Sequence, residues 1–91
     1  MASRTIGVVG AGTMGSGIAQ LAAQNGFDVV IRDIEQELVD EGLARIEENL
    51  AEAEEREIID DADATFDLVS GTTDIEMVAD RASFIVEAAP E

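Results

Sequence analysis

The feature that most constrains this chain is a glycine-rich turn between an apolar run and a helical pattern. The turn, Gly10-Ala11-Gly12-Thr13-Met14-Gly15, has glycine at its first, third and sixth positions. Residues 5–9 before it form a short run without charged residues, which is typical of a buried parallel strand. Apolar residues after it recur at the spacing of one helical face: Met14, Ile18, Leu21 and Ala22. The sequence therefore predicts a strand that enters a tight turn and leaves it as a helix.

A second strand follows at the distance that completes a strand–helix–strand unit. Gly26 marks the end of the helix, because glycine readily adopts the left-handed conformation of a C-terminal cap. Residues 28–32 form the second apolar run, and Asp33 lies at its carboxyl end, 18 residues after Gly15. A unit of this length, about 30 residues, is typical of parallel strands joined by a crossover helix. These elements predict an α/β fold.

The three glycines and Asp33 have the properties of a dinucleotide-binding site. Gly10 permits the tight turn, Gly12 lets a pyrophosphate approach the backbone, and Gly15 lets the helix pack closely on the sheet. The helix N-terminus adds unpaired N–H groups and a partial positive charge. A carboxylate at Asp33 can accept hydrogen bonds from the adenosine ribose and repels a 2′-phosphate, which favours NAD over NADP. Arg32 beside it could instead hold a 2′-phosphate, which would favour NADP. A glycine turn without any ligand is the remaining alternative.

The rest of the chain predicts a long acidic helix and two more strands. Residues 35–63 contain thirteen acidic residues and two arginines, around an apolar seam at helical spacing: Val39, Leu43, Ile46, Leu50 and Ala53. The helix is expected to break at residues 60–63, where aspartates favour caps and turns. Residues 68–72 and 83–88 predict the third and fourth strands, with a brief helix over 74–81 between them. Together they predict a Rossmann-type parallel sheet of about four strands with an acidic helical arm.

Composition excludes several classes of function. The 91 residues carry a formal net charge of −16, and all five basic residues are arginines. Unassisted binding to nucleic acid is excluded, and binding to anionic membranes is disfavoured, because few cations can replace counterions. The chain has no Cys and no His, so disulfides, thiolate metal sites and the commonest general base are absent. No metal site is predicted, since clustered glutamates are typical of a solvated face. The acidic, lysine-free composition favours a soluble protein of a salt-rich cytoplasm, and an acidic mesophilic protein is the alternative.

Two acidic residues flank the end of the predicted fourth strand. Glu87 lies inside that strand and Glu91 lies beyond it. In open α/β sheets, ligands bind outside the carboxyl ends of the strands. Either carboxylate could therefore face a bound cofactor, and a solvated acid at the end of a strand is the alternative for both.

Residues 10–20, Gly-Ala-Gly-Thr-Met-Gly-Ser-Gly-Ile-Ala-Gln, closely resemble the N-terminal NAD-binding domain of the L-3-hydroxyacyl-CoA dehydrogenases. The similarity continues through residues 29–33, 44–50, 71–74 and 85–91, so it covers nearly the whole chain. It implies a Rossmann domain with a long helical arm between the second and third strands. It also implies that NAD is bound by the following residues: Gly10, Ala11, Gly12, Thr13, Met14, Gly15, Asp33, Ala88 and Glu91.

The resemblance also indicates which parts of the family's enzymes are missing here. Polar and basic residues of the family's arm contact the adenine nucleotide of CoA. Asn49 and Arg56 lie at about the matching positions, whereas acids replace the usual lysines. The family's catalytic His and Glu, its last sheet strands and its dimerisation domain all follow the segment matched here. Residues 1–91 are therefore expected to be a C-terminally truncated NAD-binding domain, without catalytic residues and inactive alone.

Two classes of function follow from these observations. In the first, the chain is the NAD-binding part of a homodimeric dehydrogenase of fatty-acid metabolism. Such an enzyme transfers a hydride between an L-3-hydroxyacyl-CoA and NAD, while a His outside this chain takes the hydroxyl proton. In the second, the chain is a stand-alone, non-enzymatic NAD-binding module. The absence of His is what the second hypothesis predicts and what the first explains by truncation.

Overall fold

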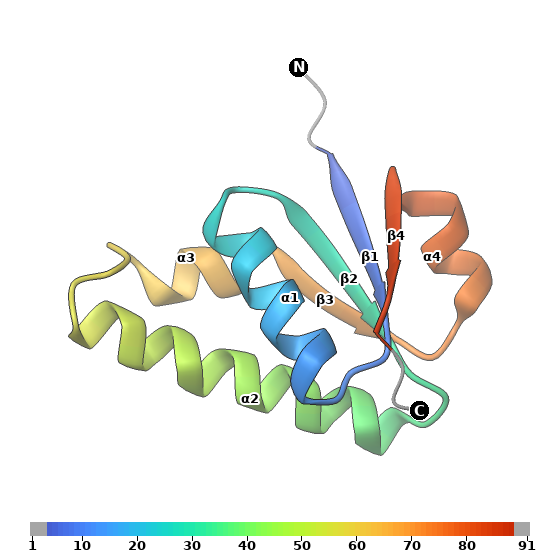
Figure 1. The fold of residues 1–91 in the computed structure, drawn as a ribbon, viewed down its shortest axis with the longest axis horizontal. Coiled ribbons are helices and arrows are strands. Elements are labelled where there is room, and N and C mark those ends of the chain that lie inside the picture. The colour runs from blue at the N-terminus through green and yellow to red at the C-terminus, as the bar shows by residue number, and fades with distance from the viewer. Residues whose placement is uncertain (1–3, 89–91) are drawn as a thin grey trace.

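A computed structural model describes residues 4–88 as a four-stranded parallel sheet with helices on both faces (Figure 1). The sheet order is β3-β2-β1-β4, and each neighbouring pair of strands is parallel. The elements in chain order are β1 (Thr5–Val9), α1 (Thr13–Gln24), β2 (Asp28–Arg32), α2 (Gln36–Glu55), α3 (Ala62–Phe66), β3 (Val69–Thr72), α4 (Ile75–Arg81) and β4 (Phe84–Glu87). The predicted α/β, Rossmann-type fold is confirmed.

The two central strands, β1 and β2, bring the predicted site residues together at their carboxyl ends. In β2, Val29, Val30 and Ile31 are fully buried, because helices cover both faces of the sheet, and this explains the continuous apolar run. The register pairs Val9, the last residue of β1, with Arg32, the last residue of β2. The glycine turn after β1 therefore emerges level with Asp33 after β2.

Helix α1 packs on the sheet through small side chains rather than large ones. Its buried residues are Gly15, Ser16, Ala19, Ala22 and Ala23. Of the four residues of the predicted apolar spacing, Ala22 is buried and Ile18 is half-buried against the core, whereas Met14 and Leu21 are 69% and 63% exposed. The spacing therefore marks the face against the sheet only in part. The reason is steric, because α1 begins directly at the turn, too close to the strands for large side chains.

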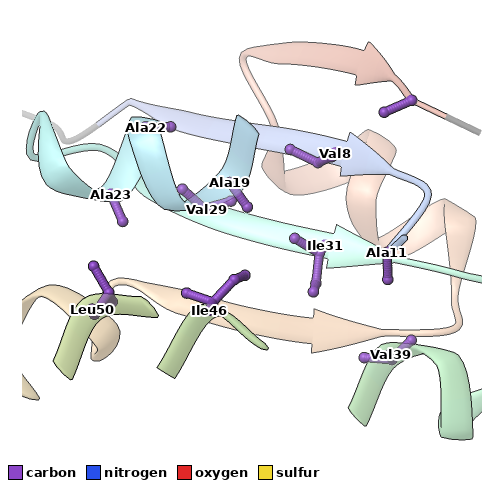
Figure 2. Close-up of a cluster of buried hydrophobic side chains, with 11 residues drawn as sticks. Val8, Ala11, Ala19, Ala22, Ala23, Val29, Ile31, Val39, Ile46 and Leu50 are labelled. Atoms are coloured by element: carbon purple, nitrogen blue, oxygen red, sulfur yellow. The ribbon is translucent and has the colours of Figure 1, made fainter. Parts of the chain in front are cut away.

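Helix α2 covers the same face of the sheet beside α1, and its predicted apolar seam is confirmed (Figure 1). Val39, Ile46, Leu50 and Ala53 are buried, and Leu43 is half-buried. Figure 2 shows Ile46 and Leu50 directed at the strands, next to the alanines of α1. This cluster forms the main apolar core of the described residues.

The predicted end of the acidic helix, at residues 60–63, is wrong. Helix α2 ends at Glu55, and Glu57 adopts a left-handed backbone with φ of +61°. The N–H groups of Glu57 and Ile58 donate to the carbonyls of Glu54 and Ala53, at 2.9 and 2.8 Å. These two bonds form a Schellman cap, which terminates the helix before the aspartates. The aspartates instead begin a separate short helix, α3, whose N-cap is Asp61.

The other face of the sheet is covered by α4. A Cβ atom on Gly7 would lie 2.6 Å from Val78 Cγ1, so α4 approaches β1 closely where β1 has no side chain. Strand β4 lies at the edge of the sheet, and its Phe84 and Ile85 are 60% and 50% exposed. Within residues 4–88, no helix has the length and apolar character needed to cross a membrane.

Candidate functional site

The three glycines of the turn have three different geometric roles. Gly10 adopts φ of +113°, and its N–H donates to the Arg32 carbonyl at 2.7 Å, which ties the turn to β2. A Cβ atom on Gly15 would lie 1.7 Å from the Gly10 carbonyl oxygen, so α1 starts in contact with the turn. A Cβ atom on Gly12 would meet nothing within 4 Å, so the space above Gly12 is open to a ligand.

The N-terminus of α1 is open to an anion. Its N-cap is Gly12, which provides no side-chain cap, and the first turn contains no acidic residue. The first N–H groups of a helix have no intrahelical acceptor, and the helix dipole makes this end partially positive. Thr13 and Met14 are exposed in this first turn, whereas Gly15 is buried beneath it. Backbone donors and open space therefore coincide at one point.

Asp33 is fixed beside this helix terminus. Its Oδ2 atom accepts a hydrogen bond from the N–H of Ala11 at 2.8 Å, and its Oδ1 atom accepts one from Ile34 at 2.7 Å. Each carboxylate oxygen has a second lone pair, so both can still accept a bond from a ligand hydroxyl. Arg32 points elsewhere, because its Nε atom donates to the Thr73 carbonyl at 3.0 Å.

A cleft of about 360 Å³ lies between the turn, the end of β2 and the first half of α2. Its lining residues are Ala11, Gly12, Asp33, Ile34, Leu38, Glu41 and Arg45. The sequence predicted Ala11, Gly12 and Asp33 as site residues and missed the other four. The missed residues recur at spacings of four, three and four, which is one face of a helix. That periodicity beside Asp33 indicates that they share one helical face, but it gives no signal that this face meets the glycine turn.

The predicted residues at the end of the fourth strand lie differently. Ala88 is buried, and its N–H donates to the Val9 carbonyl at 2.8 Å, so it lies beside the start of the turn. Glu87 is exposed and is paired with Val9, on the face of the sheet that α4 covers rather than on that of α1. Glu91 lies outside the described residues.

The residues predicted to contact CoA do not line this cleft. Asn49 and Arg56 are both exposed, at the middle and the end of α2. Arg56 pairs with Glu52 at 3.5 Å, and both side chains are more than 60% exposed.

A second hollow, of about 460 Å³, lies at the amino ends of β2 and β3, beside Gly26 and Leu68. No predicted site residue lines it. Across residues 4–88, no group of three potential metal ligands converges.

Comparison with known proteins finds relatives of one family. Residues 5–91 match the family model "3-hydroxyacyl-CoA dehydrogenase, NAD binding domain". The chain is 46% identical over 86 residues to a probable 3-hydroxybutyryl-CoA dehydrogenase of Deinococcus radiodurans, covering 93% of this chain and 31% of that protein. It is 32% identical over 91 residues to the mitochondrial hydroxyacyl-coenzyme A dehydrogenase of Sus scrofa, covering 92% and 29%.

Solved structures show the same similarity. The (S)-3-hydroxybutyryl-CoA dehydrogenase of Ralstonia eutropha superimposes with a TM-score of 0.88 at 35% identity, covering 99% of this chain and 32% of that chain. A lactate dehydrogenase of Cryptosporidium parvum, at 20% identity and a TM-score of 0.66, shares the fold alone. The chain thus spans about a third of the length of the three hydroxyacyl-CoA and hydroxybutyryl-CoA dehydrogenases named above.

Proposed function

We propose that NAD is held in the cleft between the glycine turn and α2. The premise is that this chain belongs to the 3-hydroxyacyl-CoA dehydrogenase family, whose NAD-binding domain it matches over residues 5–91. One observation carries this proposal. In a chain with 21 acidic residues, the N-terminus of α1 has neither an acidic residue nor a side-chain cap. Because this end is positive and Gly12 leaves it uncovered, it fits a pyrophosphate.

Each side of the cleft fits one part of the dinucleotide. The backbone of residues 11–15 would hold the pyrophosphate, and Asp33 would accept hydrogen bonds from the adenosine ribose. Ile34 and Leu38 provide an apolar wall for the adenine. Ala88 and Glu91 would complete the site after β4. When bound, NAD supplies the acceptor of the hydride.

The whole protein would then oxidise an L-3-hydroxyacyl-CoA, and this chain would contribute the cofactor site alone. The absence of His supports a proton-accepting group outside residues 1–91, so the chain alone is expected to bind NAD without turnover. Strand β4 lies at the edge of the sheet with Phe84 and Ile85 exposed, which supports an incomplete NAD-binding domain. The whole protein would supply the missing parts outside residues 1–91: further strands, the catalytic residues and a dimerisation domain. For the acyl-CoA, Asn49 and Arg56 remain the candidate contacts on the arm. A net charge of −16 disfavours nucleic acid as a partner.

Replacement of Asp33 tests the cofactor assignment. Asp33→Ala removes the carboxylate that holds Ala11 and faces the ribose, so the Kd for NAD should rise at least tenfold, and discrimination against NADP should decrease. Titration calorimetry with NAD and NADP measures both effects.

The matched control for this experiment is Asp80→Ala. Asp80 is an exposed acid on α4, the helix on the other face of the sheet, so its loss removes the same charge away from the cleft. Affinity for NAD should be unchanged in this variant. Equal affinity of the wild type and Asp33→Ala for NAD would refute the ribose contact.

We also propose that the protein is adapted to a salt-rich cytoplasm. Among residues 4–88, a single ion pair, Arg56–Glu52, offsets the acidic residues, so their mutual repulsion must be screened by salt. Stability measured by circular dichroism should rise from low to molar KCl. The dependence should weaken when three acids of α2 that make no described side-chain bond are neutralised: Glu47→Gln, Glu48→Gln and Glu55→Gln. Stability that is independent of KCl would refute the adaptation.

A further inference from the structure

One cation lies inside the cleft that we assign to NAD. Arg45, from the middle of α2, is half-buried and lines the cleft together with Asp33 and Glu41. No carboxylate pairs with it, since the one ion pair among the described residues joins Arg56 and Glu52. The guanidinium therefore makes no ion pair with either carboxylate of the cleft.

The partners of Arg45 are oxygen atoms of the turn and of α1. Its Nη1 atom lies 3.2 Å from Ser16 Oγ and 3.4 Å from the Ala11 carbonyl oxygen. Ser16 is 1% exposed, and its hydroxyl donates to the Gly12 carbonyl at 2.6 Å. A hydroxyl has one proton, so Ser16 accepts the bond from Arg45 while it donates to Gly12. Arg45 is thus linked to the carbonyls of both Ala11 and Gly12.

These hydrogen bonds also orient the backbone N–H groups of the turn, which would face the bound NAD. In a planar trans peptide, the carbonyl and the N–H that follows it point in opposite directions. When the carbonyls of Ala11 and Gly12 are held toward Arg45 and Ser16, the N–H groups of Gly12 and Thr13 point away from them. Both N–H groups are among those that the start of α1 leaves without an intrahelical acceptor.

A close contact between α2 and the turn makes this reach possible. A Cβ atom on Gly42 would lie 2.7 Å from the Ala11 carbonyl oxygen, so the α2 backbone touches the turn at this point. Arg45 follows Gly42 by three residues and therefore lies on the same face of α2. This backbone packing brings the guanidinium to its two partners, the Ala11 carbonyl and the Ser16 hydroxyl.

We propose that Arg45 is a positioning residue of the NAD site, which orients the peptides of the glycine turn and supplies a positive charge beside the dinucleotide phosphates. This inference rests on the proposed NAD site. The charge is needed because Asp33 and Glu41 line the same cleft and would otherwise repel two phosphate charges.

The test measures the affinity of the purified protein for NAD, ADP and adenosine, by calorimetry at a KCl concentration where every variant is folded. Arg45→Gln should weaken NAD and ADP about tenfold, since bonds to charged groups are the stronger ones, and should change the neutral adenosine less than twofold. Arg45→Lys keeps the charge and should fall between the wild type and Arg45→Gln. Ser16→Ala removes the bridging hydroxyl and should weaken NAD about threefold.

The matched control is Arg81→Gln, which removes the same charge from an exposed position at the end of α4 and should leave all three affinities unchanged. An Arg45→Gln variant that binds NAD as tightly as the wild type would overturn the inference, and so would equal weakening of NAD and adenosine. If Arg45→Gln does not fold, Arg45→Lys decides, and an unchanged Kd for both NAD and ADP in it overturns the positioning role. A wild type that binds none of the three probes would instead overturn the proposed function.

Discussion

The N-terminus of α1 differs from those of the other three helices of the described chain. Helix α3 is capped by the carboxylate of Asp61 and α4 by that of Asp74, which accepts bonds from the N–H groups of Glu76 and Met77. Helix α2 has no side-chain cap but carries Glu37 in its first turn. Helix α1 has neither feature, although it belongs to a chain with 21 acidic residues.

We interpret this difference as one between helix termini that serve stability and a terminus that serves the proposed ligand. A side-chain cap contributes about 1 kcal/mol, and an acid in the first turn contributes about 0.3–1 kcal/mol. Helix α1 forgoes both contributions and leaves its backbone donors exposed beside Asp33. Stability that a structural helix would retain is given up where activity requires an open site. Two substitutions, each with a matched control, test this interpretation.

The largest effect is expected at Gly15, where α1 touches the turn. In Gly15→Ala the new Cβ would overlap the Gly10 carbonyl oxygen, which is backbone and cannot move aside without displacing the turn. The free energy of unfolding should fall by about 3 kcal/mol, and NAD binding should be lost. Denaturant unfolding and calorimetry measure the two effects.

Gly17→Ala in the same helix is the matched control for Gly15→Ala. A Cβ atom on Gly17 would meet nothing within 4 Å, and the position is exposed. This variant should be more stable by about 0.5–1 kcal/mol, because alanine loses less backbone entropy than glycine in a helix. If Gly15→Ala matched Gly17→Ala in stability, the close contact between α1 and the turn would be disproved.

An intermediate effect is expected when α1 is given the cap that α3 and α4 already have. Gly12→Asp places a carboxylate at the N-cap, where the backbone is extended and nothing blocks the side chain. Stability should rise by about 1 kcal/mol, while the Kd for NAD should rise at least tenfold, because the carboxylate takes the donors and repels the pyrophosphate. Thermal unfolding and calorimetry on the same samples check both changes.

The opposite replacement, Asp74→Ala, serves as the control for a purely structural terminus. It removes a cap from α4 and should cost about 1 kcal/mol without any change in NAD affinity. A Gly12→Asp variant that retained full NAD affinity would show that the N-terminus of α1 is not where the anion binds.

Features that depend on residues close together in the chain could be predicted from the sequence. The bounds of β1 and β2, the glycine turn and Asp33 were all predictable, because a buried parallel strand and a glycine motif depend on residues close together in the chain. The left-handed conformation of Gly26, with φ of +89°, was predicted and is confirmed for the same reason.

The features that sequence reasoning missed depend on packing between distant segments. Met14 and Leu21 gave α1 an apolar spacing that the structure leaves exposed, because the distance from α1 to the sheet is set by Gly15 and the turn. Arg45 could not be assigned to the cleft, since its position follows from the contact between Gly42 and Ala11, which are 31 residues apart. Hydrophobic periodicity identifies a helix but not how closely that helix approaches its neighbours.

The smallest effect is expected at the C-termini, where α1 and α2 use the same cap with different residues. Both end in the two hydrogen bonds of a Schellman cap, with Gly26 in the left-handed position of α1 and Glu57 in that of α2. A non-glycine residue in this conformation is strained, so Glu57→Gly should stabilise the protein by about 1 kcal/mol and raise Tm by about 4 °C.

The control for this prediction is Glu55→Gly, which removes the same charge from the last turn of α2, where the backbone is helical. This variant should instead destabilise the protein by about 0.5–1 kcal/mol. NAD affinity should not change in either variant, because both positions lie outside the cleft, and a gain in stability from both glycines would attribute the effect to charge rather than to backbone conformation.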